Sequence, residues 1–125
     1  MRVFVESERE TFLRAQVTNI TWDTITIEDT GDCITVNANY KPLPKHPKHF
    51  INVSNLNFRN IKGTGCKDPP EFVCPEQSPC QKITLDNVHL SGTSGKDQKM
   101  DCQNAFGTAV DGVVPQSCLK SGRPQ

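Results

Sequence analysis

Three segments of this chain repeat the same alternation of apolar and polar residues around a central asparagine. The segments are residues 17–22 (VTNITW), 53–58 (VSNLNF) and 85–90 (LDNVHL). In each segment, apolar residues lie two positions before the asparagine, directly after it and three positions after it. A period of two is typical of a β-strand with one buried face, and repetition at tens of residues is typical of a stacked-repeat fold. A short strand cannot bury its inner face alone, so the copies are predicted to stack as a parallel β-solenoid.

The three central residues, Asn19, Asn55 and Asn87, are expected to lie in register on successive turns. Asparagine tolerates the left-handed backbone conformation, and its side chain can form a hydrogen bond to the turn above. The apolar residue that follows each asparagine would then belong to one inner column.

The alternation weakens after about residue 92, and the chain from Thr93 onward is mainly polar and rich in glycine. A length of 125 residues limits the chain to one domain. We therefore expect one β-helical unit over residues 1–125, in which residues 93–125 form an irregular tail closed by a disulfide.

Composition and charge exclude several classes of partner. The chain has 14 basic and 14 acidic residues, so its formal net charge is zero. It therefore lacks the basic field that nucleic acids or anionic membranes require, and no apolar stretch is long enough to span a membrane. Only 34% of the residues are apolar, and a solenoid tolerates this because its core is a thin column.

The six cysteines predict disulfides in an oxidising compartment. No CxxC motif and no paired histidines at zinc-finger spacing are present, so we expect no metal ion and no cofactor. Cys74 and Cys80 bracket a short loop that contains proline, and Cys102 and Cys118 bracket the tail. These two pairs are the predicted bridges. The remaining two cysteines, at positions 33 and 66, stay unassigned.

Two glycosylation sequons also suit a secreted chain, one at Asn19 (NIT) and one at Asn52 (NVS). Residues 1–15 contain no signal-peptide pattern, and an alternating, strand-like segment begins at Arg2. We therefore expect a secreted protein whose export signal was lost together with an N-terminal portion.

The order of several segments resembles the C-terminal portion of the polygalacturonases, the pectin-degrading enzymes of glycoside hydrolase family 28. Residues 17–27 resemble a strand pair that follows the substrate-binding strand, and residues 34–40 resemble a strand that ends in a tyrosine near the sugar-binding cleft. Residues 51–63, 74–88 and 102–118 are similar to the next turn, the disulfide loop with the last full strand, and the tail. The resemblance implies a right-handed parallel β-helix of the pectin-lyase type, in a secreted monomer whose parent enzyme acts on polygalacturonate.

The catalytic motifs of that family are missing from this sequence. Inverting hydrolysis requires one carboxyl group as acid and a second as base. The family carries them on Asn-Thr-Asp and Asp-Asp motifs beside a Gly-His-Gly motif, and none of these three occurs here. We therefore assign no catalytic residue and expect this chain alone to be inactive.

Two residues are candidates for substrate binding through the resemblance. Arg2 lies near the place of the family's Arg-Ile-Lys strand, although Phe4 replaces the lysine, and a guanidinium fork suits a carboxylate. Tyr40 is the chain's one tyrosine and combines an aromatic face with a polar tip. The alternatives are a solvated arginine and a tyrosine that caps the core. Asp29 and Asp32 flank Thr-Gly and are interpreted as turn residues.

Two functions of different classes follow. The first is a pectin-degrading glycoside hydrolase that cleaves α-1,4-galacturonosyl bonds and is represented here by a fragment without its catalytic aspartates. The alternative is a non-catalytic secreted β-helical module that binds acidic polysaccharide or a protein partner. A third possibility is a small disulfide-linked secreted protein that shares only the strand periodicity.

Overall fold

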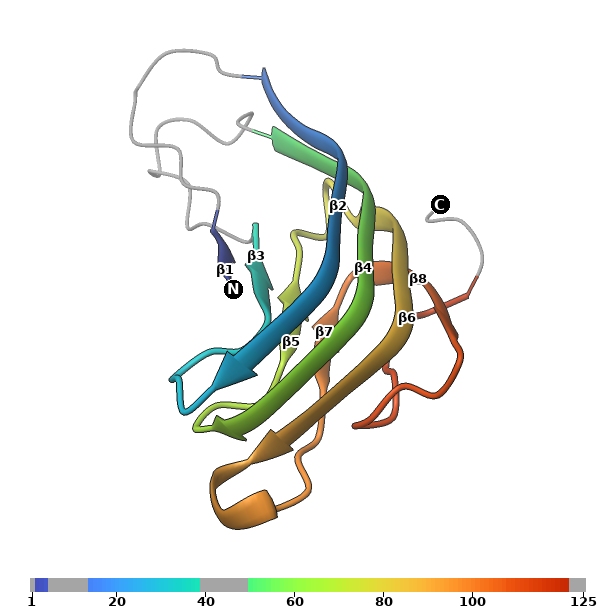
Figure 1. Cartoon of the computed structure of the whole chain (residues 1–125). Coiled ribbons are helices and arrows are strands. Elements are labelled where there is room, and N and C mark those ends of the chain that lie inside the picture. Colours follow the sequence, from blue (N-terminus) through green and yellow to red (C-terminus); the bar gives the residue numbers. More distant parts are fainter. Residues whose placement is uncertain (1, 5–13, 39–49, 122–125) are drawn as a thin grey trace.

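A computed structural model describes residues 2–4, 14–38 and 50–121 of the chain. These residues form a right-handed parallel β-helix with two four-stranded parallel sheets (Figure 1). The short-strand sheet contains β1 (Arg2–Phe4), β3 (Thr35–Asn37), β5 (Glu71–Val73) and β7 (Asp101–Gln103). The long-strand sheet contains β2 (Arg14–Glu28), β4 (Phe50–Cys66), β6 (Cys80–Gly92) and β8 (Ala105–Val110), and a 3-10 turn, η1 (Thr93–Gly95), follows β6.

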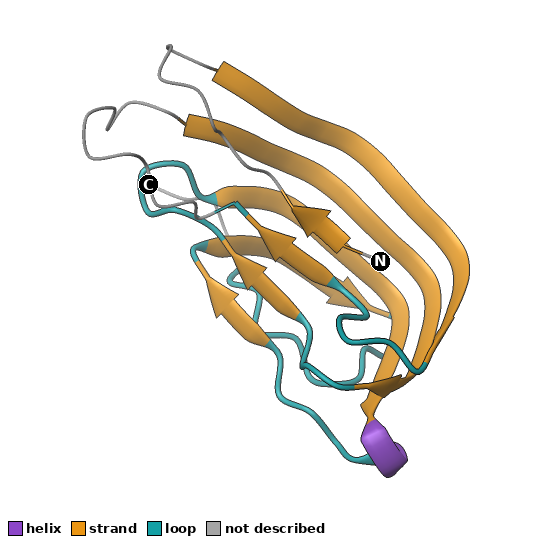
Figure 2. Cartoon of the chain, turned by 90° about the vertical axis from the view of Figure 1, so that its left-hand side faces the viewer, coloured by secondary structure: helices purple, strands orange, loops and turns teal. Residues whose placement is uncertain are grey.

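Short and long strands alternate along the chain, so each coil of the helix contributes one strand to each sheet. The long strands curve around one side of the stack of short strands, as Figure 2 shows. Hydrogen bonds between strands therefore run from coil to coil, and the side chains that point inward fill a narrow column between the two sheets. Within the described residues, no helix is long and apolar enough to cross a membrane.

The long strands bend at residues with left-handed backbone, which recur every five residues. In β4 these residues are Asn55 (φ 55°) and Asn60 (φ 51°), and Gly65 (φ 66°) follows five residues later. Asparagine adopts this conformation more readily than most residues, because its short polar side chain can hydrogen-bond locally. Each such residue turns the strand, so one continuous strand can follow the corner of a coil. The equivalent positions are Asn19 and Thr24 in β2, and Lys82 and Asn87 in β6.

The predicted ladder of three asparagines is right for its first pair and wrong for its third member. The Asn55 Nδ2 donates to the Asn19 Oδ1 at 2.6 Å. Asn87 instead stacks on Asn60, to whose Oδ1 its Nδ2 donates at 3.0 Å. The reason is that Ile83, and not Val88, pairs with Leu56 in the next coil. Left-handed residues recur every five residues within a strand, so the asparagine motif of β6 can be aligned with either bend of β4. In the structure it aligns with the second bend, at Asn60.

The core is a column of apolar side chains that stack from coil to coil. Phe58 in β4 stacks on Trp22 in β2 with ring centroids 4.7 Å apart, and it meets the edge of Phe72 in β5 at 5.9 Å. Aromatic pairs in these geometries contribute beyond the area they bury. Fully buried residues around them complete the column: Val36, Val53, Leu56, Ile61, Ile83, Leu85 and Val88.

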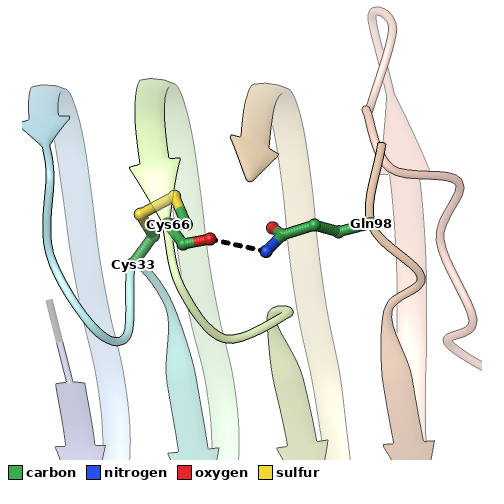
Figure 3. Close-up of a disulfide and its surroundings, with 3 residues drawn as sticks. All are labelled: Cys33, Cys66 and Gln98. Atoms are coloured by element: carbon green, nitrogen blue, oxygen red, sulfur yellow. Dashed lines mark hydrogen bonds between the residues drawn. A yellow bond between two sulfur atoms is a disulfide. The ribbon is translucent and has the colours of Figure 1, made fainter. Parts of the chain in front are cut away.

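Disulfides join all six cysteines. Cys74 pairs with Cys80 and Cys102 pairs with Cys118, as the sequence predicts. The two unassigned cysteines, Cys33 and Cys66, also pair and connect the ends of successive coils (Figure 3). From the loop after β6, the Gln98 Nε2 donates to the carbonyl oxygen of Cys66 at 2.7 Å, so the third coil is tied to this bridge.

The segment predicted as an irregular tail contains two strands of the helix. β7 and β8 lie within residues 93–125 and pair in parallel with β5 and β6. Gly107 shows why the sequence pattern is weak here: it pairs with Ile83, and a Cβ at its position would collide with the Ile83 carbonyl. The small residues that obscure the alternation therefore permit close packing of the last described coil.

Candidate functional site

Of the two predicted substrate-binding residues, Arg2 lies within the described backbone and Tyr40 does not. Arg2 begins β1 and pairs with Thr35 in β3. The same rung continues through Glu71 in β5 to Asp101 in β7. Tyr40 lies outside the described residues, so its predicted role stays a prediction.

The positions of the short-strand sheet that point away from the core are mostly polar. Val36 and Phe72 occupy the central rung and are fully buried, so the residues on either side of them in the strands face outward. Thr35 is nevertheless buried, and its hydroxyl has no hydrogen-bond partner in the described part of the chain. Asn37 belongs to the other rung that faces outward. It pairs with Val73, which in turn pairs with Gln103.

The acidic turn at residues 28–32 forms the corner between β2 and β3, as predicted. The Asp29 N–H donates to the Thr64 carbonyl at 2.9 Å, and Asp29 has left-handed backbone with φ 48°. The Gly31 carbonyl accepts from the Asp68 N–H at 2.9 Å. These backbone bonds give the turn a structural role, because they fasten it to the corner of the next coil.

A second pair of carboxyl groups, which the sequence analysis missed, lies on the long-strand sheet. Asp86 in β6 is hydrogen-bonded to Asp111, which follows β8 directly. This hydrogen bond raises the pKa of Asp86 above its ordinary value of 3.8, and partial burial and the Asp111 charge act in the same direction. Arg59 in β4 opposes the rise, with its Nε 3.7 Å from the Asp86 Oδ2.

Asp23 lies one coil before Arg59 in the same rung, and its pKa is shifted in the opposite direction to that of Asp86. Its carboxylate accepts from the Asn60 Nδ2 at 3.0 Å and from the Thr24 hydroxyl at 2.9 Å. These two hydrogen bonds lower the pKa of Asp23 below 3.8; burial opposes them, and the charge of Arg59 adds a smaller lowering effect. Asp23 therefore stays ionised in mildly acidic solution.

The two shifts have opposite consequences for stability. The raised pKa of Asp86 stabilises the fold below pH 3.8, and this contribution is lost as the pH rises through the folded-state pKa. The lowered pKa of Asp23 stabilises the fold above pH 3.8, and that contribution is lost as the pH falls through its folded-state pKa. The negative charge of Asp111 beside Asp86 thus disfavours the ionised form of Asp86.

The Asp86–Asp111 pair does not have the geometry of a glycosidase acid and base. Such carboxyl groups stand about 5–5.5 Å apart in retaining enzymes and about 6.5–9.5 Å apart in inverting ones, with the sugar bond between them. A direct hydrogen bond leaves no room for that bond. In the described ranges, no group of three or more His, Cys, Asp or Glu side chains is arranged to hold a metal ion.

The sequence carried only an indirect signal for this pair. Asp86 pairs with the rung of Val110, so Asp111 lies one coil and one residue further along the chain. Two acidic residues separated by the length of one coil would be expected to lie side by side. The last coil lacks the repeat motif from which the length of a coil could be measured.

Both predicted glycosylation sites fall on strands of the long-strand sheet. Asn19 is exposed, and its side-chain Oδ1 accepts from the Asn55 Nδ2. This hydrogen bond does not use the Asn19 Nδ2, the atom to which an N-linked sugar is attached. Asn52 is half-buried and pairs with Gln16. Glycosylation at these two positions stays a prediction.

Comparison with known proteins gives a consistent result. Residues 10–118 match the sequence profile of the family described as "Glycosyl hydrolases family 28". A polygalacturonase from Persea americana is 31% identical over 91 residues, which cover 69% of this chain and 20% of the relative. Polygalacturonase-2 from Solanum lycopersicum is 30% identical over 104 residues, or 80% of this chain and 23% of the relative.

A relative named rhamnogalacturonase matches a shorter part of the chain. Probable rhamnogalacturonase A from Aspergillus oryzae is 34% identical over 76 residues, which cover 58% of this chain and 15% of the relative. The chain thus spans between 15% and 23% of the length of these three relatives. No solved structure matches the chain significantly.

Proposed function

The chain belongs to glycosyl hydrolase family 28, and we propose on that basis that it is the C-terminal part of a secreted pectin-degrading glycosidase. The whole enzyme would hydrolyse α-1,4-galacturonosyl bonds in polygalacturonate. The observation that carries this proposal is the family match over residues 10–118, together with relatives named polygalacturonase. The parallel β-helix described above agrees with it.

The catalytic acid and base would lie in a part of the enzyme outside these 125 residues. Two observations support this location. The chain corresponds to less than a quarter of the length of the polygalacturonases above. The two carboxyl clusters considered above, residues 28–32 and the Asp86–Asp111 pair, form a stacked corner and a direct hydrogen bond. Carboxyl groups in direct hydrogen-bond contact lie too close together to flank a glycosidic bond, and the backbone bonds of the turn give residues 28–32 a structural role.

The contribution of this chain to the substrate site would come from the short-strand sheet. Arg2 begins β1, and Tyr40 follows the last residue of β3, Asn37, by three positions. A guanidinium fork can form two parallel hydrogen bonds to a uronate carboxylate, and an aromatic ring can cover the apolar face of a sugar. We assign these two roles to Arg2 and Tyr40.

Reducing-sugar release from polygalacturonate tests the proposal. The 125-residue chain should be compared with the longest protein that the source organism makes from this gene. We expect release by the longer protein and none by the 125-residue chain, since binding without an acid and a base leaves the chemical barrier almost unchanged. Release by the short chain that disappears in Asp29→Asn or Asp32→Asn would overturn the assignment and make that turn the active site.

The alternative function, a non-catalytic module that binds acidic polysaccharide, is favoured by one observation. The two carboxyl clusters considered above make contacts within the fold: the backbone of the acidic turn bonds to the next coil, and Asp86 is hydrogen-bonded to Asp111. If the source makes only the 125-residue protein, and this protein binds polygalacturonate without cleaving it, the binding module replaces the enzyme as the conclusion.

A further inference from the structure

The outer face of the long-strand sheet carries a groove that neither the family match nor the proposed catalysis accounts for. One depression of about 300 Å³ lies over β4 and β6, and a second of about 150 Å³ continues it. Both are lined by Lys62 and His89, so they form one surface, which we name the β4–β6 groove. Its lining consists of Asn60, Ile61, Lys62, Gly63, Thr64, Asn87, His89, Leu90, Ser91 and Val114.

Strand alternation places the basic residues of the groove side by side. Ile61 and Val88 pair with each other and point into the core. The next residues, Lys62 and His89, also pair with each other and are exposed. Neighbouring strands lie about 4.8 Å apart, so the ammonium and imidazole groups project from adjacent points of one rung. Both groups can donate hydrogen bonds to an anion.

Two amide side chains, which lie two residues before Lys62 and His89 in their strands, are fixed in orientation. The Asn87 Nδ2 donates to the Asn60 Oδ1, and the Asn60 Nδ2 donates to the Asp23 Oδ1, each at 3.0 Å. An amide group has two N–H donors and one carbonyl acceptor, so each side chain retains hydrogen-bonding capacity after these bonds. The groove therefore offers preorganised partners for hydroxyl groups.

An exposed apolar side chain borders the groove on the other side. Val114 is 46% exposed, which is high for a valine. Its backbone is fixed, because the Val114 N–H donates to the Val88 carbonyl at 2.9 Å and its own carbonyl accepts from the Leu90 N–H at 2.7 Å. The apolar surface next to the basic pair is thus held in place by the strand that carries His89.

We propose that the β4–β6 groove binds a carboxylate-bearing oligosaccharide, that is, a short run of uronate residues. Lys62 and His89 would bind the carboxylate, Asn60 and Asn87 the hydroxyl groups, and Val114 the apolar face of a ring. None of the described residues that line the two depressions is acidic. The volume is at the lower end of the range of about 300–1,000 Å³ for small-ligand sites, which suits one or two sugar rings.

This site would be separate from the substrate face of the proposed enzyme. Arg2 belongs to the short-strand sheet, whereas the groove is formed by β4 and β6 of the long-strand sheet. The groove would hold a pectin chain at a second place on the β-helix, and its ligand chemistry depends on its own residues and not on hydrolysis.

The test is an NMR titration of the ¹⁵N-labelled, oxidised 125-residue chain with trigalacturonate. We expect amide shifts at Lys62, His89 and Val114. Lys62→Gln and His89→Gln should each raise the Kd about tenfold, the loss expected for one charge-assisted hydrogen bond. Lys82→Gln is the matched control, because Lys82 is exposed on the same strand as His89 but does not line the groove. Retained dispersion of the spectra shows that the variants fold.

Two other ligands identify the recognised chemistry. Methyl-esterified trigalacturonate should bind much more weakly, and inorganic phosphate should leave the spectrum unchanged. The proposal is overturned by equal affinity for the ester, by the same shifts with phosphate, or by a Lys62→Gln variant that binds like the Lys82→Gln control. Shifts confined to β3, β5 and β7 would remove the groove as a site but leave the proposed substrate face intact, and an absence of any shifts would also overturn the groove.

Discussion

Replacing Phe58 with alanine tests whether the aromatic stack holds neighbouring coils together. Phe58 is 0% exposed and contacts Trp22 in the preceding coil and Phe72 in the short-strand sheet. Loss of a buried phenylalanine costs about 3–5 kcal/mol in free energy of unfolding. Two aromatic pairs disappear, each worth about 0.5–1.5 kcal/mol beyond buried area, so we expect the upper half of that range. Domains have a total stability of about 5–15 kcal/mol, so the variant should be close to unfolding.

Urea unfolding followed by tryptophan fluorescence measures this effect directly. Trp22 is the chain's one tryptophan and stacks on Phe58, so its emission reports on the same contact. The unfolding midpoint should fall while the slope m stays unchanged. Arg59→Ala is the control on the adjacent position, where the side chain is 51% exposed and makes a surface ion pair with Asp86, which contributes little to stability. A Phe58→Ala cost below about 1 kcal/mol, or one no larger than that of Arg59→Ala, would refute the argument.

Three further predictions follow from individual contacts. Replacing Cys33 and Cys66 together with alanine should lower the free energy of unfolding by about 3–4 kcal/mol, because the bridge spans 33 residues; a loss below about 1 kcal/mol in urea would contradict this. Asn87→Ala should lower it by about 1–2 kcal/mol through the lost ladder bond and the left-handed backbone (φ 55°), and Asn87→Gly should recover the backbone part; equal thermal midpoints for the two variants would contradict this. Asp111→Asn should flatten the fall in thermal midpoint above about pH 4, because an amide can donate to the ionised Asp86 and the charge that raises the pKa of Asp86 is removed; an unchanged pH profile would contradict this.

Local chemistry explains what the sequence predicted correctly. Alternation with a period of two marks which residues of a strand face the core, and it identified Leu56, Phe58, Leu85 and Val88 as inward-facing. Two disulfides were also predictable, because each closes a short loop whose ends must meet. The acidic turn before Cys33 was recognised from its Thr-Gly pair.

The predictions failed where the answer depends on which coil meets which. The chain advances 36 residues between Asn19 and Asn55 but only 27 between Asn60 and Asn87, so no constant period gives the register of the third coil. The last coil was not recognised because Gly107, which lies against Ile83, breaks the apolar pattern.

The sequence by itself determined the strand pattern and the parallel stacking, because a half-buried strand must cover its apolar face with another copy of itself. Only the tertiary structure decided the pairs that meet between coils. Lys62 meets His89, Asp86 meets Asp111, and Cys33 meets Cys66. Each pair is separated by about one coil of chain, and the length of a coil is set by its loops, whose residues carry no periodic signal. The physical reason is that hydrogen-bond register fixes these contacts, and register becomes defined only when the coils are packed on one another.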